Sequence, residues 1–422
     1  MQLAIEGGSP LRGKIKPQGA KNAALKLAAA ALLTEEPCLI RGVPRIQDVN
    51  YMVEILTLLG AQVQFQDGNL WIQAAGELKP HVPEELARTM RASIQVMGPL
   101  LARTGYVRAA EPGGCNIGPR PVDYHIKGLT ALGSRAREEH GYVELEAGRL
   151  TGTDIHLDYP SVGATENIMM AATLAQGVTR IYNAAKEPEI AEEQNFLNSM
   201  GAQISGAGTD MIRIEGKERL RGTSWQLCAD RIEVGTYMIA AGITGGEIEI
   251  YGAHEHHVAA VLGKLLETGC KIVRESGLIK VTGPSRPKPV CVYALPYPGF
   301  PTDLQQQIMA LLSLAEGTSL VVETVFNDRF RHVDELRRMG ADIKVEGRSA
   351  LVRGVKQLSG AQVEAPDLRG GMALLLASLA AKGESVIKGT EHLDRGYENL
   401  VEKFRSLGAH VRLQEDAPRG EN

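Results

Sequence analysis

The clearest hydrophobic pattern in this chain is a short phrase that recurs at nearly even intervals. It reads apolar, glycine, small, any residue, apolar, as in LGAQV at 59, MGAQI at 200 and LGAHV at 407. The glycines of the six copies lie 68 to 73 residues apart and are Gly60, Gly133, Gly201, Gly269, Gly340 and Gly408. Each copy predicts a helix that ends at a left-handed glycine and is followed by a half-buried strand.

Upstream of most copies the pattern predicts two helices in different surroundings. The first is apolar nearly all round, which favours burial on every side, and the second is amphipathic, which favours a surface position. Clear examples occupy residues 168–204, 308–343 and 372–411, with a short strand between the two helices. A period near 70 residues exceeds the common solenoid repeats, so we predict a compact αβ unit repeated three times per domain.

The length of 422 residues predicts two domains, because a single core rarely grows that large. Three units on each side place the boundary near residue 230. We therefore predict a first lobe of residues 21–230, and a second lobe of residues 1–20 and 231–422 that includes the crossover from the N-terminus. A cleft between two lobes is a preferred place for a ligand.

Composition narrows the function classes. The 46 basic and 50 acidic side chains leave a net charge of −4, which argues against a protein that binds nucleic acid or membrane through bulk charge. The five cysteines show no CxxC spacing, so neither a disulfide framework nor a zinc site is predicted. No apolar run is long enough for a membrane span or a signal peptide. We expect a cytoplasmic monomer without a metal or cofactor.

The loop EPGGCNIGPRPVDYH, residues 111–125, holds the most distinctive chemistry. Gly113 and Gly114 free the backbone before Cys115, so the thiol can be presented in the open. Arg120 is close enough in sequence to favour the thiolate or to hold an anion beside it. A Pro/Gly turn with an incidental small apolar cysteine is the alternative interpretation.

Two predicted helix starts carry cations. Lys21 and Asn22 open the first apolar helix, where free backbone N–H groups and the helix dipole favour an anion. A solvated lysine with a capping asparagine explains this pair equally well. Arg88 and Arg91 stand three residues apart at the start of another helix that soon becomes apolar.

Two further helix starts carry acceptors. Ser161 in PSVGATEN is predicted as an N-cap, and the N–H groups behind it could also bind a phosphate. Asp303 in YPGFPTDLQQQ is the counterpart in the second lobe. It is either a capping carboxylate, which is the commoner case, or a catalytic one placed against a substrate hydroxyl.

Four arginines mark helix starts in the last two units: Arg329, Arg331, Arg369 and Arg395. Guanidinium groups bind carboxylates and phosphates in a bidentate manner, so the cluster would suit a small substrate bearing both. The alternative is internal ion pairing with neighbouring acids, namely Asp328, Asp367 and Asp394.

Taken together, these motifs resemble a known family over essentially the whole chain. GAKNAAL, TMRAS, PGGCNIGPRPVDYH, SVGATEN, YPGFPTDLQ, DLRG and HLDRGYE occur in the order found in the UDP-N-acetylglucosamine enolpyruvyl transferases of peptidoglycan synthesis. The resemblance implies an α/β fold, the two-lobed inside-out α/β barrel with three repeated αβ units per lobe and six in total. That number agrees with the six repeats found in the hydrophobic pattern.

The resemblance also implies a reaction. Phosphoenolpyruvate would donate its enolpyruvyl group to the 3′-hydroxyl of UDP-N-acetylglucosamine and release phosphate, by addition and elimination through a tetrahedral ketal. Cys115 would protonate the methylene carbon, could form a covalent adduct with phosphoenolpyruvate, and would be alkylated by fosfomycin. Asp303 would accept the proton of the attacking hydroxyl.

Ligand contacts are implied in the same way. Those at the phosphate are the catalytic Lys21 and Arg395 together with Arg120, and those near the carboxylate are Arg329 and Arg369. The implied contacts to the nucleotide sugar and the reacting centre are Asn22, Arg91, Arg120, Pro121, Val122, Asp123, Tyr124, Ser161, Val162, Gly163, Asp303 and Val325.

Three alternative functions compete with this interpretation. The related enzyme that acts on shikimate 3-phosphate shares the fold but lacks the cysteine loop. A non-catalytic nucleotide-sugar sensor would be expected to lose Cys115, Asp303 or Arg395, and all three are present. A protein-binding repeat scaffold would show long exposed concave faces, whereas the all-apolar helices favour closed lobes.

Overall fold

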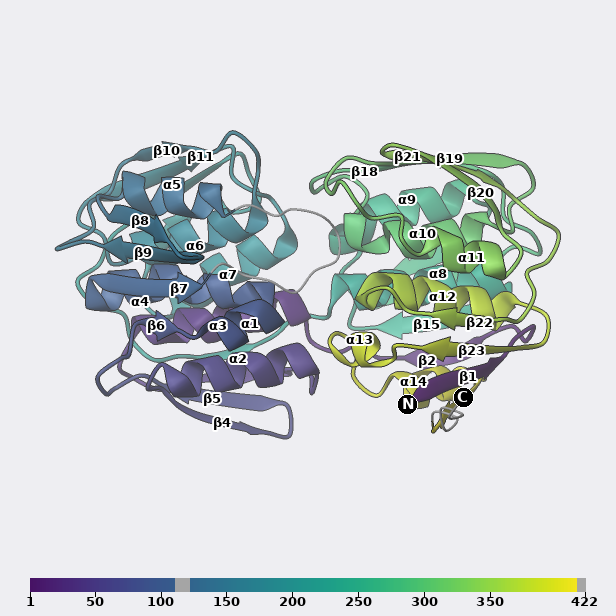
Figure 1. Ribbon diagram of the computed structural model, residues 1–422, viewed down its shortest axis with the longest axis horizontal. Helices are drawn as coiled ribbons and strands as arrows, with labels where there is room; N and C mark the ends of the chain where they lie inside the picture. Colours follow the sequence, from purple (N-terminus) through teal and green to yellow (C-terminus); the bar gives the residue numbers. More distant parts are fainter. Residues whose placement is uncertain (111–121, 416–422) are drawn as a thin grey trace. The chain divides into compact units, whose positions relative to one another are not determined.

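A computed structural model describes residues 1–110 and 122–415 (Figure 1). The chain forms two compact units, divided between Gln18 and Gly19 and again between Cys228 and Ala229. Unit 1 contains Met1–Gln18 and the residues from Ala229 onward, and unit 2 contains the segment between them. Each unit has its own hydrophobic core.

Strands in the described residues form six four-stranded sheets with one shared connectivity. In each sheet an edge strand pairs in parallel with the second strand, and the remaining two pairings are antiparallel. One example has the order β10 (Asp154–His156), β11 (Val178–Tyr182), β13 (Met211–Glu215) and β12 (Gln203–Ser205). Three such sheets per unit confirm the repeat predicted from the hydrophobic pattern.

Unit 2 contains two more sheets of this kind. The first has the order β14 (Ser224–Gln226), β3 (Cys38–Arg41), β5 (Asn69–Gln73), β4 (Gln62–Gln66). The second has the order β6 (His81–Val82), β7 (Tyr106–Ala110), β9 (Tyr142–Glu146), β8 (Arg135–Glu139).

Unit 1 builds two of its sheets with strands from the N-terminus. Strand β1 (Gln2–Glu6) lies between β23 (Glu384–Lys388) and β24 (His410–Gln414), with β22 (Gln362–Glu364) at the edge. The other sheets follow the orders β16 (Lys271–Glu275), β17 (Leu278–Thr282), β15 (Glu247–Tyr251), β2 (Arg12–Ile15) and β18 (Cys291–Ala294), β19 (Thr318–Glu323), β21 (Ser349–Arg353), β20 (Asp342–Glu346).

The predicted buried helices lie inside the units. They are α1 (Lys21–Ala30), α4 (Met97–Thr104), α6 (Val162–Ala172), α8 (Arg231–Thr244), α10 (Gln305–Leu312) and α12 (Leu368–Ala380). In unit 1, α8, α10 and α12 contact one another, and strands lie above and below them in the view (Figure 1). Helices inside and sheets outside give the inside-out α/β arrangement that the resemblance implied.

The six glycines of the recurring phrase end the second helices as predicted. These helices are α2 (Gln47–Leu58), α5 (Asp123–Ala131), α7 (Pro188–Ser199), α9 (Ala259–Glu267), α11 (Val333–Arg338) and α14 (Leu400–Ser406). Each glycine that follows has a left-handed φ, between 88° at Gly408 and 101° at Gly133. At Gly60 the next residue, Ala61, donates its N–H to the Leu56 carbonyl, which satisfies an end carbonyl of α2.

One helix prediction needs correction. The segment that carries Arg88 and Arg91 is not the start of one helix but three short segments: α3 (Glu84–Thr89), the 3₁₀ turn η2 (Arg91–Val96) and α4. Met90 has φ −143° and ψ 122°, an extended conformation that no helix can contain. Arg91 therefore opens η2 and not a long helix.

Candidate functional site

Asp303 lies at the centre of a charged network in unit 1. It belongs to the 3₁₀ turn η4 (Thr302–Leu304), which leads into α10. Its Oδ1 accepts a hydrogen bond from Nη2 of Arg329 at 2.6 Å, and its Oδ2 accepts one from Nη2 of Arg369 at 2.9 Å. The structure thus brings together three residues that the sequence analysis singled out separately.

The two arginines decide the protonation of Asp303. Burial alone would raise the pKa of this carboxyl, but the charges of Arg369 and Arg329 outweigh it and hold the pKa far below its usual range. In return, although burial opposes the charge of Arg369, Asp303 raises the pKa of that guanidinium. The carboxylate is therefore ionised at any physiological pH.

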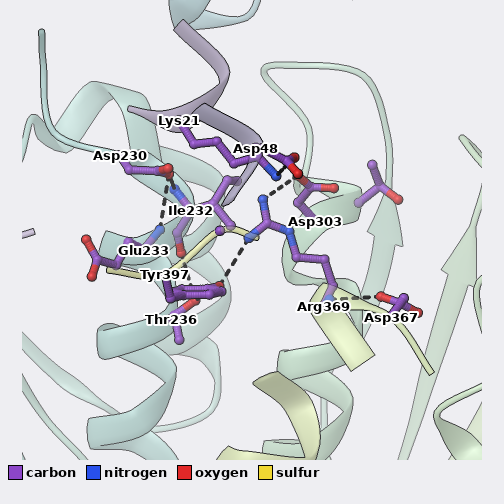
Figure 2. A network of polar contacts seen from close by, with 12 residues as sticks. Lys21, Asp48, Asp230, Ile232, Glu233, Thr236, Asp303, Asp367, Arg369 and Tyr397 are labelled. Atoms are coloured by element: carbon purple, nitrogen blue, oxygen red, sulfur yellow. Dashed lines mark hydrogen bonds and ion pairs between the residues drawn. The ribbon is translucent and has the colours of Figure 1, made fainter. Parts of the chain in front are cut away.

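A chain of hydroxyl groups holds Arg369 from its other side. Figure 2 shows its guanidinium reaching toward Asp303 and toward the ring hydroxyl of Tyr397, which accepts a hydrogen bond from Nη1 at 3.2 Å. The Tyr397 hydroxyl lies 3.1 Å from Oγ1 of Thr236, which donates to the Ile232 carbonyl of α8. Arg369 is thus fixed to two central helices, α8 and α12.

A second chain of contacts holds Arg329. Its Nη1 donates to Oγ1 of Thr302 at 2.5 Å, and that hydroxyl donates to Oε2 of Glu323 at 2.7 Å. The other Glu323 oxygen accepts the backbone N–H groups of Val325 and Phe326 at 2.8 and 3.1 Å. The segment with Val325, an implied nucleotide-sugar contact, is thereby tied to the same network.

The remaining arginines of the cluster divide between the two interpretations. Arg331 pairs with Asp328 on the exposed surface, as the ion-pair alternative predicted. The carboxylate of Asp367 instead caps α12, where it accepts the N–H groups of Arg369 and Gly370. Arg395 is half-buried and directly follows α13 (Glu391–Asp394), two residues before Tyr397.

In unit 2, Lys21 and Asn22 open α1 as predicted. Lys21 is not a solvated lysine, because it is buried and its ammonium lies 2.7 Å from Oδ2 of Asp48 in the first turn of α2. Asn22 does not cap the helix, since Ala20 occupies the N-cap position. The alternative of a solvated lysine beside a capping asparagine is therefore wrong for this pair.

The other implied contacts of unit 2 cluster at helix starts. Ser161 is the N-cap of α6, where its Oγ accepts the N–H of Ala164 at 3.4 Å, and Val162 and Gly163 form the first turn. The positions at the start of α5 are Val122, Asp123 and Tyr124. Arg91 starts η2 and is half-buried.

Cys115, Arg120 and Pro121 lie outside the described residues. The other four cysteines form no disulfide within the described residues, and two of them are poor nucleophile candidates. Burial raises the pKa of Cys38 to about 11 and also raises the pKa of Cys270. Cys291 is exposed, and the thiol of Cys228 donates to Oε2 of Glu192 at 2.8 Å.

The sequence analysis missed several polar residues that support the site. Tyr397, Thr302 and Glu323 position the two arginines, and Asp48 pairs with Lys21. Tyr397 stands inside the HLDRGYE motif, so its place there was a usable signal. Glu323 ends β19 and resembles any other polar strand end in sequence.

Within residues 1–110 and 122–415, no group of three or more His, Cys, Asp or Glu side chains is arranged to hold a metal ion. The helices of the same ranges are all too short or too polar to cross a membrane.

Comparisons with known proteins agree with this architecture. A family model described as EPSP synthase (3-phosphoshikimate 1-carboxyvinyltransferase) matches residues 5–404. Relatives named UDP-N-acetylglucosamine 1-carboxyvinyltransferase are 51% identical over 411 residues in Caldanaerobacter subterraneus and 52% identical over 408 residues in Carboxydothermus hydrogenoformans. The alignments cover 97% of this chain in both cases, and 99% and 97% of the relatives.

Solved structures show the same fold. The enolpyruvyl transferase NikO from Streptomyces tendae is 26% identical and superposes with a TM-score of 0.88, covering 97% of this chain and 98% of NikO. An EPSP synthase from Acinetobacter baumannii, at 19% identity and a TM-score of 0.75, covers 98% of this chain and 100% of that enzyme and supports the fold alone. The chain therefore belongs to the enolpyruvyl transferase family, within which its 51–52% identical relatives are UDP-N-acetylglucosamine 1-carboxyvinyltransferases.

Proposed function

We propose that this chain transfers the enolpyruvyl group of phosphoenolpyruvate to the 3′-hydroxyl of UDP-N-acetylglucosamine, the first committed step of peptidoglycan synthesis. The observation that supports this most strongly is the identity of 51–52%, across almost the full length, to relatives that carry this activity in their name. The Asp303 network adds a physical reason, because it holds a carboxylate and two guanidinium groups where an anionic donor could meet them. The reaction is expected in the cytoplasm and within a single chain.

The proposed chemistry balances without a cofactor. In the addition step, the 3′-oxygen bonds to C2 of phosphoenolpyruvate, the hydroxyl proton passes to Asp303, and the thiol of Cys115 protonates C3. In the elimination step, the Cys115 thiolate takes a proton back from C3 and the bond from C2 to the phosphate oxygen breaks, which restores the double bond. The proton held by Asp303 passes to the departing phosphate, so both groups return to their starting states. Fixed positive charges favour such a step because the donor carries two anionic groups around the reacting carbon.

The arginines also set when Asp303 can act as a base. With both guanidinium groups bound to it, the depressed pKa makes Asp303 a weak proton acceptor. A donor carboxylate placed against Arg329 and Arg369 would compete for the same N–H groups and offset their charge. The basicity of Asp303 would then rise only after phosphoenolpyruvate has bound, so the base becomes competent when its substrate is present.

The remaining roles follow the family resemblance. Lys21, Arg120 and Arg395 bind the phosphate, and Lys21 is held at a helix start that favours an anion. By the same resemblance, the contacts to the nucleotide sugar are the residues at the starts of α5, α6 and η2, and Val325.

The direct test is incubation of the purified chain with both substrates, followed by phosphate measurement and mass analysis of the sugar nucleotide. We expect phosphate release only when both substrates are present, and a sugar nucleotide heavier by one enolpyruvyl group. Shikimate 3-phosphate offered in place of the nucleotide sugar should give no phosphate. Turnover with shikimate 3-phosphate alone would overturn the proposed acceptor.

The acid role of Cys115 has its own test. Cys115→Ala should remove nearly all turnover, while Cys291→Ala, a change at another non-disulfide thiol, should leave it within about twofold. Fosfomycin should modify one peptide, that of Cys115, and leave the buried Cys38 and Cys270 untouched. Phosphate release unaffected by Cys115→Ala would refute the role.

A further inference from the structure

Two adjacent polar residues of α6, Glu166 and Asn167, are completely buried in unit 2, and neither is an implied ligand contact. Glu166 Oε2 lies 3.2 Å from the ammonium of Lys26 on α1 and accepts a hydrogen bond from Nε2 of Gln95 on η2 at 3.1 Å. The same Gln95 nitrogen lies 3.3 Å from the carbonyl of Gly163 in the first turn of α6. Glu166 thus joins α1, η2 and α6.

Asn167 extends the connections to two further elements. Its amide nitrogen donates to the Ile94 carbonyl of η2 at 2.9 Å and lies 2.9 Å from Nδ1 of His125 on α5. Its Oδ1 accepts the N–H of Gly98 in α4 at 2.6 Å. All the polar atoms of the Asn167 side chain are therefore engaged with neighbouring segments.

The packing around Gly163 shows how closely these elements fit. A Cβ atom at this position would lie 3.0 Å from Nε2 of Gln95 and 3.1 Å from the ring of His125. A larger residue here would have to displace the side chains of η2 and α5, which approach the first turn of α6 closely. The start of α6 therefore packs closely against both η2 and α5.

We propose that Glu166 and Asn167 are positioning residues, which fix the starts of α1, η2, α5 and α6 relative to one another and so set the geometry of the substrate contacts in unit 2. These are the elements that carry Lys21 and Asn22, Arg91, Asp123 and Tyr124, and Ser161 to Gly163. The inference rests on the proposed function for the identity of the ligands, but the connections themselves are contacts of this chain. Small displacements of such helix starts would change ligand affinity because N–H and guanidinium contacts depend steeply on distance.

The charged groups around Glu166 make its contacts with Lys26 and Gln95 depend on whether Glu166 is protonated. The carboxyl groups of Glu187, the N-cap of α7, and of Glu189 and Glu193 within α7 lie in the same region as the ammonium of Lys26. His125 of α5 contacts the adjacent Asn167. Burial, together with the neighbouring carboxylates and despite Lys26, raises the pKa of Glu166 to about 7. Within the described residues neither oxygen of Glu193 has a hydrogen-bond partner.

The test compares two variants that remove the contacts of Glu166 or Asn167 with one that keeps the shape of the Glu166 side chain. We expect Glu166→Ala and Asn167→Ala to raise the KM for the nucleotide sugar by about tenfold while kcat changes less, as for other residues that orient ligand-binding groups. Glu166→Gln, which keeps an acceptor near Lys26, should restore KM to within about threefold and lose the pH dependence of KM near neutrality. The matched control is Thr165→Val, at an equally buried neighbour whose hydroxyl bonds only the Ala185 N–H among the described contacts.

A second readout does not depend on the identity of the ligand. Hydrogen exchange in peptides covering residues 21–30, 91–96 and 123–131 should rise together in Glu166→Ala and Asn167→Ala, but not in Thr165→Val. Equal exchange and equal KM in all three variants would overturn the inference even if the wild-type enzyme turns over both substrates. Coupled exchange without any turnover by the wild-type chain would instead count against the proposed function.

Discussion

The acids inside the helix networks of the two units differ more than the folds of the units do. In unit 1, both oxygens of Asp303 accept guanidinium hydrogen bonds, and both oxygens of Glu233 are engaged by Lys403, Tyr237 and the N–H of Gln18. In unit 2, one oxygen of Glu166 and both oxygens of Glu193 lack a partner among the described residues. A shared repeat therefore fixes where helix starts meet, but not whether the charges there are balanced.

This contrast shows what each unit is built to do. A carboxylate between two arginines stays ionised over the whole physiological pH range. Its pKa can rise only when another anion competes for the two guanidinium groups. A glutamate among other acids, with one lysine, gains or loses a proton near neutral pH. The Asp303 network is therefore expected to hold a fixed charge pattern, and the Glu166 network one that changes with pH.

The largest expected effect on kcat comes from replacing Asp303, whose charge is balanced by Arg329 and Arg369. Asp303→Asn should lower kcat by about 10²- to 10⁴-fold, the usual contribution of a proton acceptor, because the amide cannot take the hydroxyl proton. Steady-state phosphate release measures it. Asp334→Asn, which removes an exposed ion pair with Arg337 in the same unit, is the control and should change kcat by less than about twofold. Activity retained in Asp303→Asn would show that unit 1 does not supply the base.

A smaller effect should come from pH in unit 2. Because the pKa of Glu166 is about 7 in the folded chain against 4.5 for an ordinary glutamate, the folded state binds more protons between these values. The free energy of opening should then fall as pH rises from 4.5 to 7, by up to about 3 kcal/mol. Hydrogen exchange of the α6 peptide, corrected for intrinsic rate, measures it.

Glu166→Gln should flatten that pH profile, whereas Thr165→Val should keep its slope. The carboxylate of Asp303 shows the opposite sign, since its depressed pKa gives stability that is present above pH 3.8 and lost only on further acidification. A Glu166→Gln profile parallel to the wild type would mean that the two centres do not differ in protonation.

The smallest expected effect is a loss of stability on replacing a repeat glycine by alanine, and it should be equal in the two units. Gly201→Ala and Gly340→Ala replace glycines with φ of 99° and 93° at the same position of the repeat, and a Cβ meets no close atom at either. Each should cost about 1–2 kcal/mol, from backbone strain alone. Gly148→Ala, where the space is open and φ is not left-handed, should cost almost nothing. Hydrogen exchange of α7 and α11 compares the first two, and clearly unequal costs would argue against equivalent units.

The fold could be predicted further than the site because its signals are local. A glycine after a helix shows its conformational role within a few residues, and all six were found at the predicted helix ends. The pairs at Asp303 join residues 26 and 66 positions apart, and no spacing in the sequence announces them. Asp303 even stands where a capping acid is common, yet Pro301 occupies the N-cap position and the carboxylate binds arginines instead.

Long separation also explains the missed contacts of unit 2. Glu166 lies 71 positions from Gln95 in the sequence. Glu166 and Asn167 are also two adjacent polar residues in an otherwise apolar helix, and the sequence alone gives them no particular role. The family resemblance supplied roles for residues at helix starts, where ligands bind. It gave no reason to examine the second turn of α6, where the supporting contacts lie.

The pairing of β1 with β24 has a consequence for how the chain is made. Strand β1 hydrogen-bonds β24, so unit 1 cannot complete this sheet until Gln414 has been synthesised. At roughly 5–20 residues per second, the N-terminal segment waits on the order of tens of seconds for its partner. Unit 2, whose described residues all lie between Gly19 and Cys228, needs no such delay, and we expect it to be folded already when β24 is synthesised.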